Sequence, residues 1–258
     1  MARVTVAGTG AVGGAVARQL LAGGHQVVVW NRTAARAAEL VRAGAQPAAT
    51  LREAVSSSPL ILLTVKDHSA VRECLAQLDE GPDATIVALC TGTAEDARLA
   101  ARRVAELGAE YLDAGIQASA ASIGTDAATI LYSGSRTAYE RHRATLELLS
   151  TPRFVGEAPD AAAVWDLALF GVWYDAQLGL LRALDTVRAA GVDVAEFAAG
   201  ARTQLGHVVA GVDATADETR QGAYPPGPAD LTEHLAVVRQ VNLSSSPWTS
   251  MLNVDVPT

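Results

Sequence analysis

The chain has 258 residues, of which 50% are hydrophobic, and its formal net charge is -8 at pH 7. This size allows one large core or two smaller ones. The acidic balance and the lack of a Lys/Arg cluster argue against a nucleic-acid partner, and no apolar run is long enough to span a bilayer. The opening MARVTVAGTG shows no charged leader region, so the sequence predicts a cytoplasmic protein without a membrane partner.

Short β-branched runs alternate with amphipathic Ala- and Leu-rich stretches in the first part of the chain. They predict strands near residues 3–7, 26–30, 60–65, 84–89, 110–113 and 128–133. Helices are expected between them, near residues 11–22, 34–43, 68–78, 94–107 and 136–149. Repeated strand and helix units predict an α/β Rossmann domain, with a mostly parallel sheet and helices on both faces.

The strand pattern stops after Gly156, and Pro159 with Asp160 opens a helical run that continues to Gly191. A helix this long would extend beyond one small domain and connect it to another. Downstream, residues 193–212 and 229–243 are also expected to be helical. We therefore expect a Rossmann domain over residues 1–157, a long interdomain helix over residues 158–191 and an all-α C-terminal domain over residues 192–258.

The stretch VTVAGTGAVGGAV places a GxGxxG pattern directly after the first strand. Gly8 permits the tight turn, Gly10 lets the backbone approach a pyrophosphate, and Gly13 allows close packing of helix and strand. Ala11 and Val12 complete the start of the helix that would face the phosphates. The pattern favours dinucleotide binding over a purely structural glycine loop, because it opens the first βαβ unit.

The end of the second strand indicates which dinucleotide is bound. An NAD site needs an acid there for the ribose 2′-hydroxyl, but the strand ends VVVWNRT and the first acidic residue of the chain is Glu39. Asn31, Arg32 and Thr33 offer an amide, a guanidinium and a hydroxyl, which suit a 2′-phosphate. NADPH is the predicted cofactor; the alternative is that Arg32 is an ordinary surface residue.

A carboxylate, Asp166, lies within the apolar helical run AVWDLALFGVWYDAQLGLL. Such an acid is usually solvated, paired or used for chemistry, because burying it unpaired costs several kcal/mol. At about 100° per residue, Phe170 lies roughly 40° from Asp166, Trp173 about 20° away on the other side and Tyr174 about 80° away. These residues predict a reactive face, although a solvated acid beside an aromatic core stripe would give the same pattern.

The chain resembles the imine reductase and reductive aminase family, relatives of the β-hydroxyacid dehydrogenases, up to about residue 240. The stretches that carry the resemblance are GTGAVGG, VVVWNRT, AAELVRAGA, CTGTAEDAR, YLDAGIQASAASIGT, ILYSGSRTAYERHRATLELL and VWDLALFG. The resemblance implies a Rossmann domain, an interdomain helix and a helical domain that is exchanged within a homodimer. Each active site would then lie at the subunit interface.

The related dehydrogenases carry a catalytic lysine on the interdomain helix. The only lysine of this chain is Lys66, and the position that aligns with the catalytic lysine is Asp166. The resemblance therefore implies hydride transfer to the C=N bond of an imine or iminium, including one formed from a ketone and an amine. Asp166 would protonate the nitrogen or anchor the cation. Some reductive aminases carry a tyrosine at the position of Tyr174, which makes it the second catalytic candidate.

Weaker candidates complete the predicted site. Further cofactor contacts are expected from Val65, Lys66, Thr91 and Ser119. Substrate contacts are expected from Trp165, Phe170, Trp173 and His234, of which His234 would reach the pocket of the partner. Cys74 and Cys90 have no ligand spacing around them, so no metal site is expected.

The sequence departs from the family pattern at three places. Ala88 stands where many members have Asn, Trp165 replaces a more usual Tyr, and the ending SSSPWTSMLNVDVPT replaces a helix. These departures fit a specialised biosynthetic enzyme. Two other functions stay open: a β-hydroxyacid dehydrogenase-like oxidoreductase without its lysine, and a nonenzymatic NADP-binding scaffold.

Overall fold

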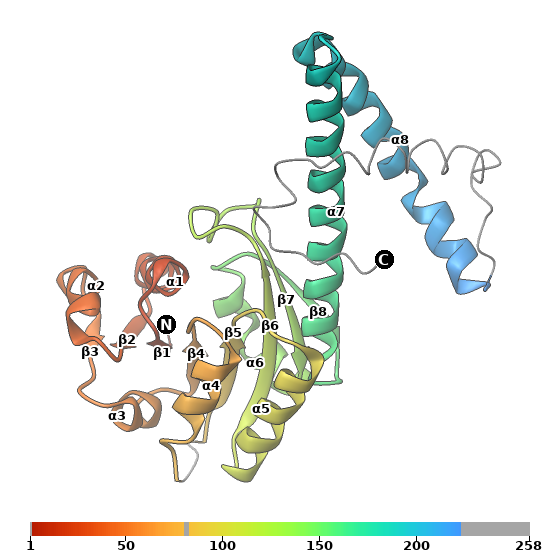
Figure 1. Ribbon diagram of the computed structural model, residues 1–258. Helices are drawn as coiled ribbons and strands as arrows, with labels where there is room; N and C mark the ends of the chain where they lie inside the picture. Colours follow the sequence, from red (N-terminus) through yellow and green to blue (C-terminus); the bar gives the residue numbers. More distant parts are fainter. Residues whose placement is uncertain (1, 80–82, 223–258) are drawn as a thin grey trace. The chain divides into compact units, whose positions relative to one another are not determined.

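The computed structural model describes residues 2–79 and 83–222 (Figure 1). The strands are β1 (Arg3–Ala7), β2 (Gln26–Trp30), β3 (Gln46–Pro47), β4 (Leu60–Leu63), β5 (Thr85–Leu89), β6 (Glu110–Gln117), β7 (Thr129–Gly134) and β8 (Thr151–Gly156). The helices are α1 (Ala11–Ala22), the 3-10 helix η1 (Ala34–Ala37), α2 (Ala38–Arg42), α3 (Leu51–Ser56), α4 (His68–Leu75), α5 (Ala94–Glu106), α6 (Arg136–Leu146), α7 (Ala161–Ala189) and α8 (Val194–Arg220). Two compact units divide between Phe170 and Gly171, inside α7.

The first unit contains one eight-stranded sheet in the order β3-β2-β1-β4-β5-β6-β7-β8. Strands β1 to β6 are parallel, β7 pairs antiparallel with β6, and β8 pairs parallel with β7. The predicted α/β Rossmann domain is confirmed. The sequence did not predict β3, α3 or β8, and it ended the strand that begins at Glu110 four residues too early, since β6 runs on to Gln117.

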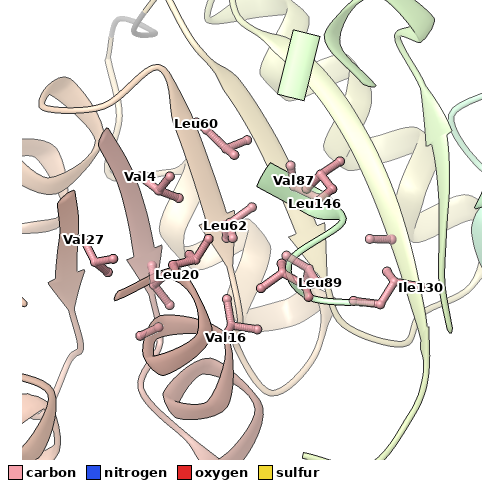
Figure 2. Packing of buried hydrophobic residues seen from close by; sticks show 14 of the residues in the cluster. Val4, Val16, Leu20, Val27, Leu60, Leu62, Val87, Leu89, Ile130 and Leu146 are labelled. Carbon is pink, nitrogen blue, oxygen red and sulfur yellow. The ribbon is translucent and has the colours of Figure 1, made fainter. Parts of the chain in front are cut away.

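Two hydrophobic cores cover the two faces of this sheet. One packs Val16 and Leu20 of α1 and Leu146 of α6 against strand residues such as Leu62 (Figure 2). The other packs α3, α4 and α5 against the opposite face, where Ile61 lies. Strand residues alternate between these cores, because successive side chains of a strand point to opposite faces.

The second unit contains the remainder of α7 and α8. Gly191 lies between them with a φ of +72°, and the Asp193 side chain caps α8 by accepting a hydrogen bond from the Glu196 amide at 2.8 Å. The predicted helix over residues 193–212 continues to Arg220, and the one predicted over residues 229–243 lies outside the described residues. Over residues 2–79 and 83–222, no helix combines the length and hydropathy needed to cross a membrane.

Candidate cofactor and active site

The glycine loop after β1 is shaped by close backbone packing. Gly8 has a φ of +103°, and a Cβ there would lie 2.4 Å from the Thr64 carbonyl oxygen. A Cβ at Gly13 would lie 2.0 Å from the Gly8 carbonyl oxygen, whereas one at Gly10 would meet no atom within 4 Å. The loop is therefore closely packed at Gly8 and Gly13 and open at Gly10. The open backbone at Gly10 is accessible to a phosphate at the start of α1.

Thr64, which follows β4, fixes this loop and was not singled out by sequence reasoning. Its hydroxyl donates a hydrogen bond to the Gly8 carbonyl oxygen at 2.6 Å. On the other side, the Gly8 amide donates to the Trp30 carbonyl oxygen at 2.8 Å. The signal available in the sequence was a threonine at the carboxyl end of the strand next to β1, where parallel strands place polar groups near a ligand.

A cavity of about 450 Å³ opens beside the glycine loop. It is lined by most of the predicted cofactor contacts, namely Gly8, Gly10, Ala11, Val12, Asn31, Arg32, Thr33, Val65 and Lys66. Gly13, Thr91 and Ser119 do not line it. Arg36 also contributes to its wall. The open backbone at Gly10 and the cations beside it fit a dinucleotide that carries an additional phosphate on its ribose.

The polar residues at the end of β2 have different surroundings. The Asn31 side chain accepts from the Thr9 amide at 3.1 Å and donates to the Thr33 carbonyl oxygen at 2.9 Å, so it ties the loops together. The Arg32 side chain is 87% exposed and lies 3.5 Å from a carboxylate oxygen of Glu73. The Arg32 side chain can therefore leave Glu73 and bind an anion at a small cost in free energy, because an exposed ion pair is weak.

Asp166, on the second turn of α7, is buried against β6. Only 1% of the residue is exposed. Its Oδ1 accepts a hydrogen bond from the Gln117 side-chain amide at 2.6 Å, while its buried Oδ2 has no hydrogen-bond partner among the described residues. A Cβ at Gly115 would lie 2.6 Å from the Cβ of Asp166, so the missing side chain at this position makes room for the acid. Asp166 is neither a solvated nor a fully paired acid.

The surroundings of Asp166 include groups that raise the pKa of its carboxyl group and groups that lower it. Burial raises the pKa of its carboxyl group, and the Gln117 amide and the Thr91 hydroxyl lower that pKa. Burial has the larger effect, so both protonation states become accessible closer to neutral pH than for an ordinary aspartate. A carboxyl group with such a pKa can carry charge or a proton during catalysis.

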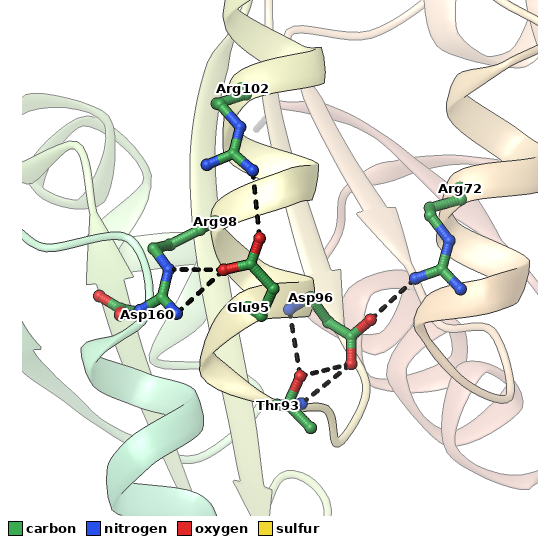
Figure 3. A network of polar contacts seen from close by, with 7 residues as sticks. All are labelled: Arg72, Thr93, Glu95, Asp96, Arg98, Arg102 and Asp160. Atoms are coloured by element: carbon green, nitrogen blue, oxygen red, sulfur yellow. Dashed lines mark hydrogen bonds and ion pairs between the residues drawn. The ribbon is translucent and has the colours of Figure 1, made fainter.

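The start of α7 is anchored to the sheet and to α5. Ser133 of β7 accepts a hydrogen bond from the Ala162 amide at 2.9 Å, which satisfies one of the free amides of the first helical turn. Figure 3 shows Asp160 beside Arg98 of α5, with which it forms an ion pair, and the Thr93–Asp96 capping box that begins α5. These contacts anchor the first turn of α7, which precedes the turn that carries Asp166.

A second buried carboxyl group, Asp113, lies two residues before Gly115 on the same face of β6. It accepts a hydrogen bond from the Tyr111 hydroxyl at 2.9 Å, and its Oδ1 lies 3.9 Å from Nε2 of the buried His68. Burial raises the pKa of Asp113 to about 7, and the nearby charge of Asp166 adds to this effect. Within the described ranges, no group of three or more acidic, histidine or cysteine side chains is arranged to hold a metal.

The other predicted site residues lie in several places. Thr91 and Ser119 are exposed, and the Ser119 hydroxyl lies 2.7 Å from that of Ser122. Trp165 is half-exposed and lies under the Arg153 guanidinium of β8, 5.7 Å from the ring centre. The ring of Trp165 therefore faces β8, and Trp165 directly precedes the buried acid in the sequence.

Three further candidates lie along α7 or beyond the described residues. Phe170 is partly buried at the end of the first unit. In the second unit, the rings of Trp173 and Tyr174 meet edge to face with centres 5.0 Å apart, and both side chains are about half-exposed. His234 lies outside the described residues.

A Rossmann sheet with a glycine loop suited to phosphates and a buried acid on the helix that follows the sheet defines a dinucleotide-dependent oxidoreductase. Residues 3–156 match the NAD binding domain of 6-phosphogluconate dehydrogenase, and residues 158–246 match the C-terminal domain of NADPH-dependent reductive aminase-like proteins.

Individual relatives agree with this class. The chain is 35% identical to an NADPH-dependent reductive aminase of Aspergillus oryzae, over 76% of this chain and 67% of that protein. The structure of an imine reductase from a Pseudomonas species superposes with a TM-score of 0.84, at 35% identity, over 93% of this chain and 86% of that one. A reductive aminase from Aspergillus terreus in complex with NADPH and ethyl-5-oxohexanoate gives a TM-score of 0.80 at 34% identity, over 95% and 89% of the two chains. The chain belongs to the imine reductase and reductive aminase family.

Proposed function

We propose that this protein is an NADPH-dependent reductase of C=N bonds. Its substrates are imines or iminium ions, including those formed by condensation of a ketone with an amine. The observation that carries the proposal is Asp166, a buried acid on the helix where related dehydrogenases have a lysine. One of its oxygens is held by Gln117 and the other has no partner among the described residues. A carboxylate stabilises a cation at carbon or nitrogen, which suits an iminium and not a ketone.

The residues around the cavity fit the cofactor. The amides at the start of α1 and the open backbone at Gly10 would hold the pyrophosphate, and Arg32 would hold the 2′-phosphate. When bound, NADPH supplies the hydride for the reduction. Val65, Lys66, Thr91 and Ser119 stay proposed contacts of the same cofactor.

Asp166 acts on the nitrogen of the substrate in this proposal. As a carboxylate it accepts a hydrogen bond from a protonated imine and stabilises its positive charge; as an acid it donates a proton to a neutral imine. Tyr174 is proposed as the second catalytic group. Trp165, Phe170, Trp173 and His234 are proposed to contact the substrate, since aromatic side chains provide the apolar surface that an organic imine needs.

We further propose a cytoplasmic homodimer that exchanges its helical domains. The dimer is supported by the apolar side chains that the second unit exposes, such as Val172, Val208 and Val209, which are 71%, 64% and 72% exposed. Several large apolar side chains exposed on helices are typical of a protein interface. Sedimentation at several protein concentrations tests this part, and a monomer at all of them would contradict it.

The reaction is tested with the purified protein and NADPH. NADPH consumption is measured with a panel of small cyclic imines and with the matched ketones, each with and without an amine. NADPH formation is measured with 3-hydroxyacids and NADP⁺. NADPH consumption that depends on an imine, or on a ketone together with an amine, is expected, with little turnover of a ketone alone or of a hydroxyacid. Hydroxyacid oxidation at a comparable rate would favour the dehydrogenase alternative, and tight NADPH binding without any turnover would favour the scaffold.

A further inference from the structure

Gln117, the last residue of β6, directs its side chain at Asp166. Its Nε2 lies 2.6 Å from Oδ1 of Asp166 and 3.4 Å from the backbone carbonyl oxygen of the same residue. Both partners are acceptors, so the nitrogen of the amide faces the acid. Two donations from one group to one residue fix the torsion angle of the carboxyl group.

The second carboxyl oxygen lies in a different environment. Oδ2 is buried and has no hydrogen-bond partner among the described residues. The carboxyl group occupies the space that a side chain at Gly115 would need, since a Cβ there would lie 2.7 Å from Oδ1. A buried carboxylate oxygen without a donor is costly, so Oδ2 is the oxygen of Asp166 whose capacity to accept a hydrogen bond is unused.

We propose that Gln117 is a positioning residue for Asp166: its amide occupies Oδ1 and leaves Oδ2 to accept a hydrogen bond from the N–H of a protonated imine. The inference rests on the proposed function and adds that the site selects the protonated, cationic form of the substrate. A ketone has no donor for Oδ2 and would leave this oxygen unpaired. Gln117 thereby selects the cationic substrate over the neutral carbonyl.

The other groups around Asp166 do not replace this donor. Asp113 on β6 is an acid and not a donor with a positive charge, and the nearby charge of Asp166 raises the pKa of Asp113. The Cys90 thiol, which follows β5, has a pKa raised to about 12 by burial and by these acids, so it stays neutral. The Thr91 hydroxyl also lowers the pKa of Asp166, by less than the Gln117 amide, and it makes no hydrogen bond to Oδ2, which has no partner among the described residues. Gln117 is the described side chain whose donation to the carboxyl group has full hydrogen-bond geometry.

The first experiment measures ionisation of Asp166 without substrate or cofactor. The carboxyl ¹³C signal of Asp166, assigned by its loss in Asp166→Asn, is titrated in the wild type and in Gln117→Met, which keeps the side-chain length and removes the donor. The pKa of Asp166 is expected to rise by about one unit or more in Gln117→Met. Gln117→Glu, which puts a like charge against Oδ1, should raise it further. Gln19→Met is the control, since Gln19 donates to the Ile123 carbonyl oxygen and not to Asp166.

The second experiment measures kcat/KM for a cyclic imine against pH. The acidic limb of the profile should move upward in Gln117→Met by the same shift, with about a 10-fold loss on the limb for each unit. A carboxyl titration that is unchanged or lowered in Gln117→Met overturns the inference, whatever the protein reduces. A wild type that reduces imines with a profile unmoved in Gln117→Met overturns it as well. A wild type without imine turnover contradicts the proposed function alone, since the titration still tests the contact.

Discussion

Gly115 and Asp166 are in direct contact, with so little space that a Cβ at position 115 would lie 2.6 Å from the Cβ of Asp166 and 2.7 Å from its Oδ1. The strand thus leaves out a side chain at the point where α7 brings its acid to the sheet. The position of Asp166 depends on this absence as much as on the hydrogen bond from Gln117.

Gly115→Ala should therefore displace the acid. The added methyl group would force α7 or β6 to shift, and overpacking of this kind costs about 1–3 kcal/mol of stability. We expect a lower denaturation midpoint and a loss of imine turnover larger than the loss of NADPH affinity. Gly171→Ala on the same helix is the control, because a Cβ there meets no atom within 4 Å. An alanine variant at 115 with wild-type turnover would contradict the contact.

Arg32→Ala tests the preference for NADPH over NADH. The Arg32 side chain is exposed and paired with Glu73, so its removal should not disturb the fold. Loss of a charge-assisted hydrogen bond to the 2′-phosphate should weaken NADPH binding by roughly 10- to 100-fold and leave NADH binding nearly unchanged. Isothermal titration of both cofactors measures the two constants.

The control for this variant is Arg42→Ala, an exposed arginine of α2 outside the cavity wall. It should bind both cofactors like the wild type. An equal loss of NADPH and NADH affinity in Arg32→Ala would show that Arg32 does not recognise the additional phosphate.

Asp113→Asn should change how stability depends on pH. Burial raises the pKa of Asp113 to about 7 in the folded protein, against about 4 in an unfolded chain. The folded state therefore binds its proton more tightly, and the free energy of unfolding falls as the pH rises between these two values, by at most about 1.4 kcal/mol per pH unit. The variant lacks this contribution, so its stability relative to wild type should increase through that window and level off above it.

Denaturant unfolding at constant ionic strength, repeated across the window, measures the difference. Asp213→Asn, at an exposed position of α8, is the control and should follow the wild-type curve. Parallel curves for wild type and Asp113→Asn would show that Asp113 ionises in the folded protein as it does in the unfolded chain.

The sequence predicted the elements whose side chains alternate or repeat clearly, and these hold the cofactor cavity. It did not predict β8, because TPRFVG contains a proline and an arginine and lies at the edge of the sheet, where the apolar pattern is weak. Helix α3 has six residues, too few to show helical periodicity. Short and edge elements depend on tertiary contacts more than on local pattern.

The contacts of Asp166 show a similar limit. The strand was expected to end at Asp113, so Gly115 and Gln117 were not recognised as part of a row on one face of β6. A glycine inside a strand signals close approach of another element, and with the full strand this signal would have indicated a contact. Nothing local relates position 117 to position 166, because their contact arises from how α7 packs on the sheet.

Reduction of a cyclic imine by Asp166→Asn under saturating NADPH tests the role of the buried acid most directly. Asparagine keeps an acceptor for Gln117 and removes the charge and the proton of the acid, so we expect NADPH affinity to stay within about twofold and kcat/KM to fall by roughly 100-fold or more. Asp175→Asn, an exposed acid on the same helix, should retain nearly full activity. An Asp166→Asn variant as active as the wild type would contradict the central claim that this buried carboxyl group acts on the substrate nitrogen.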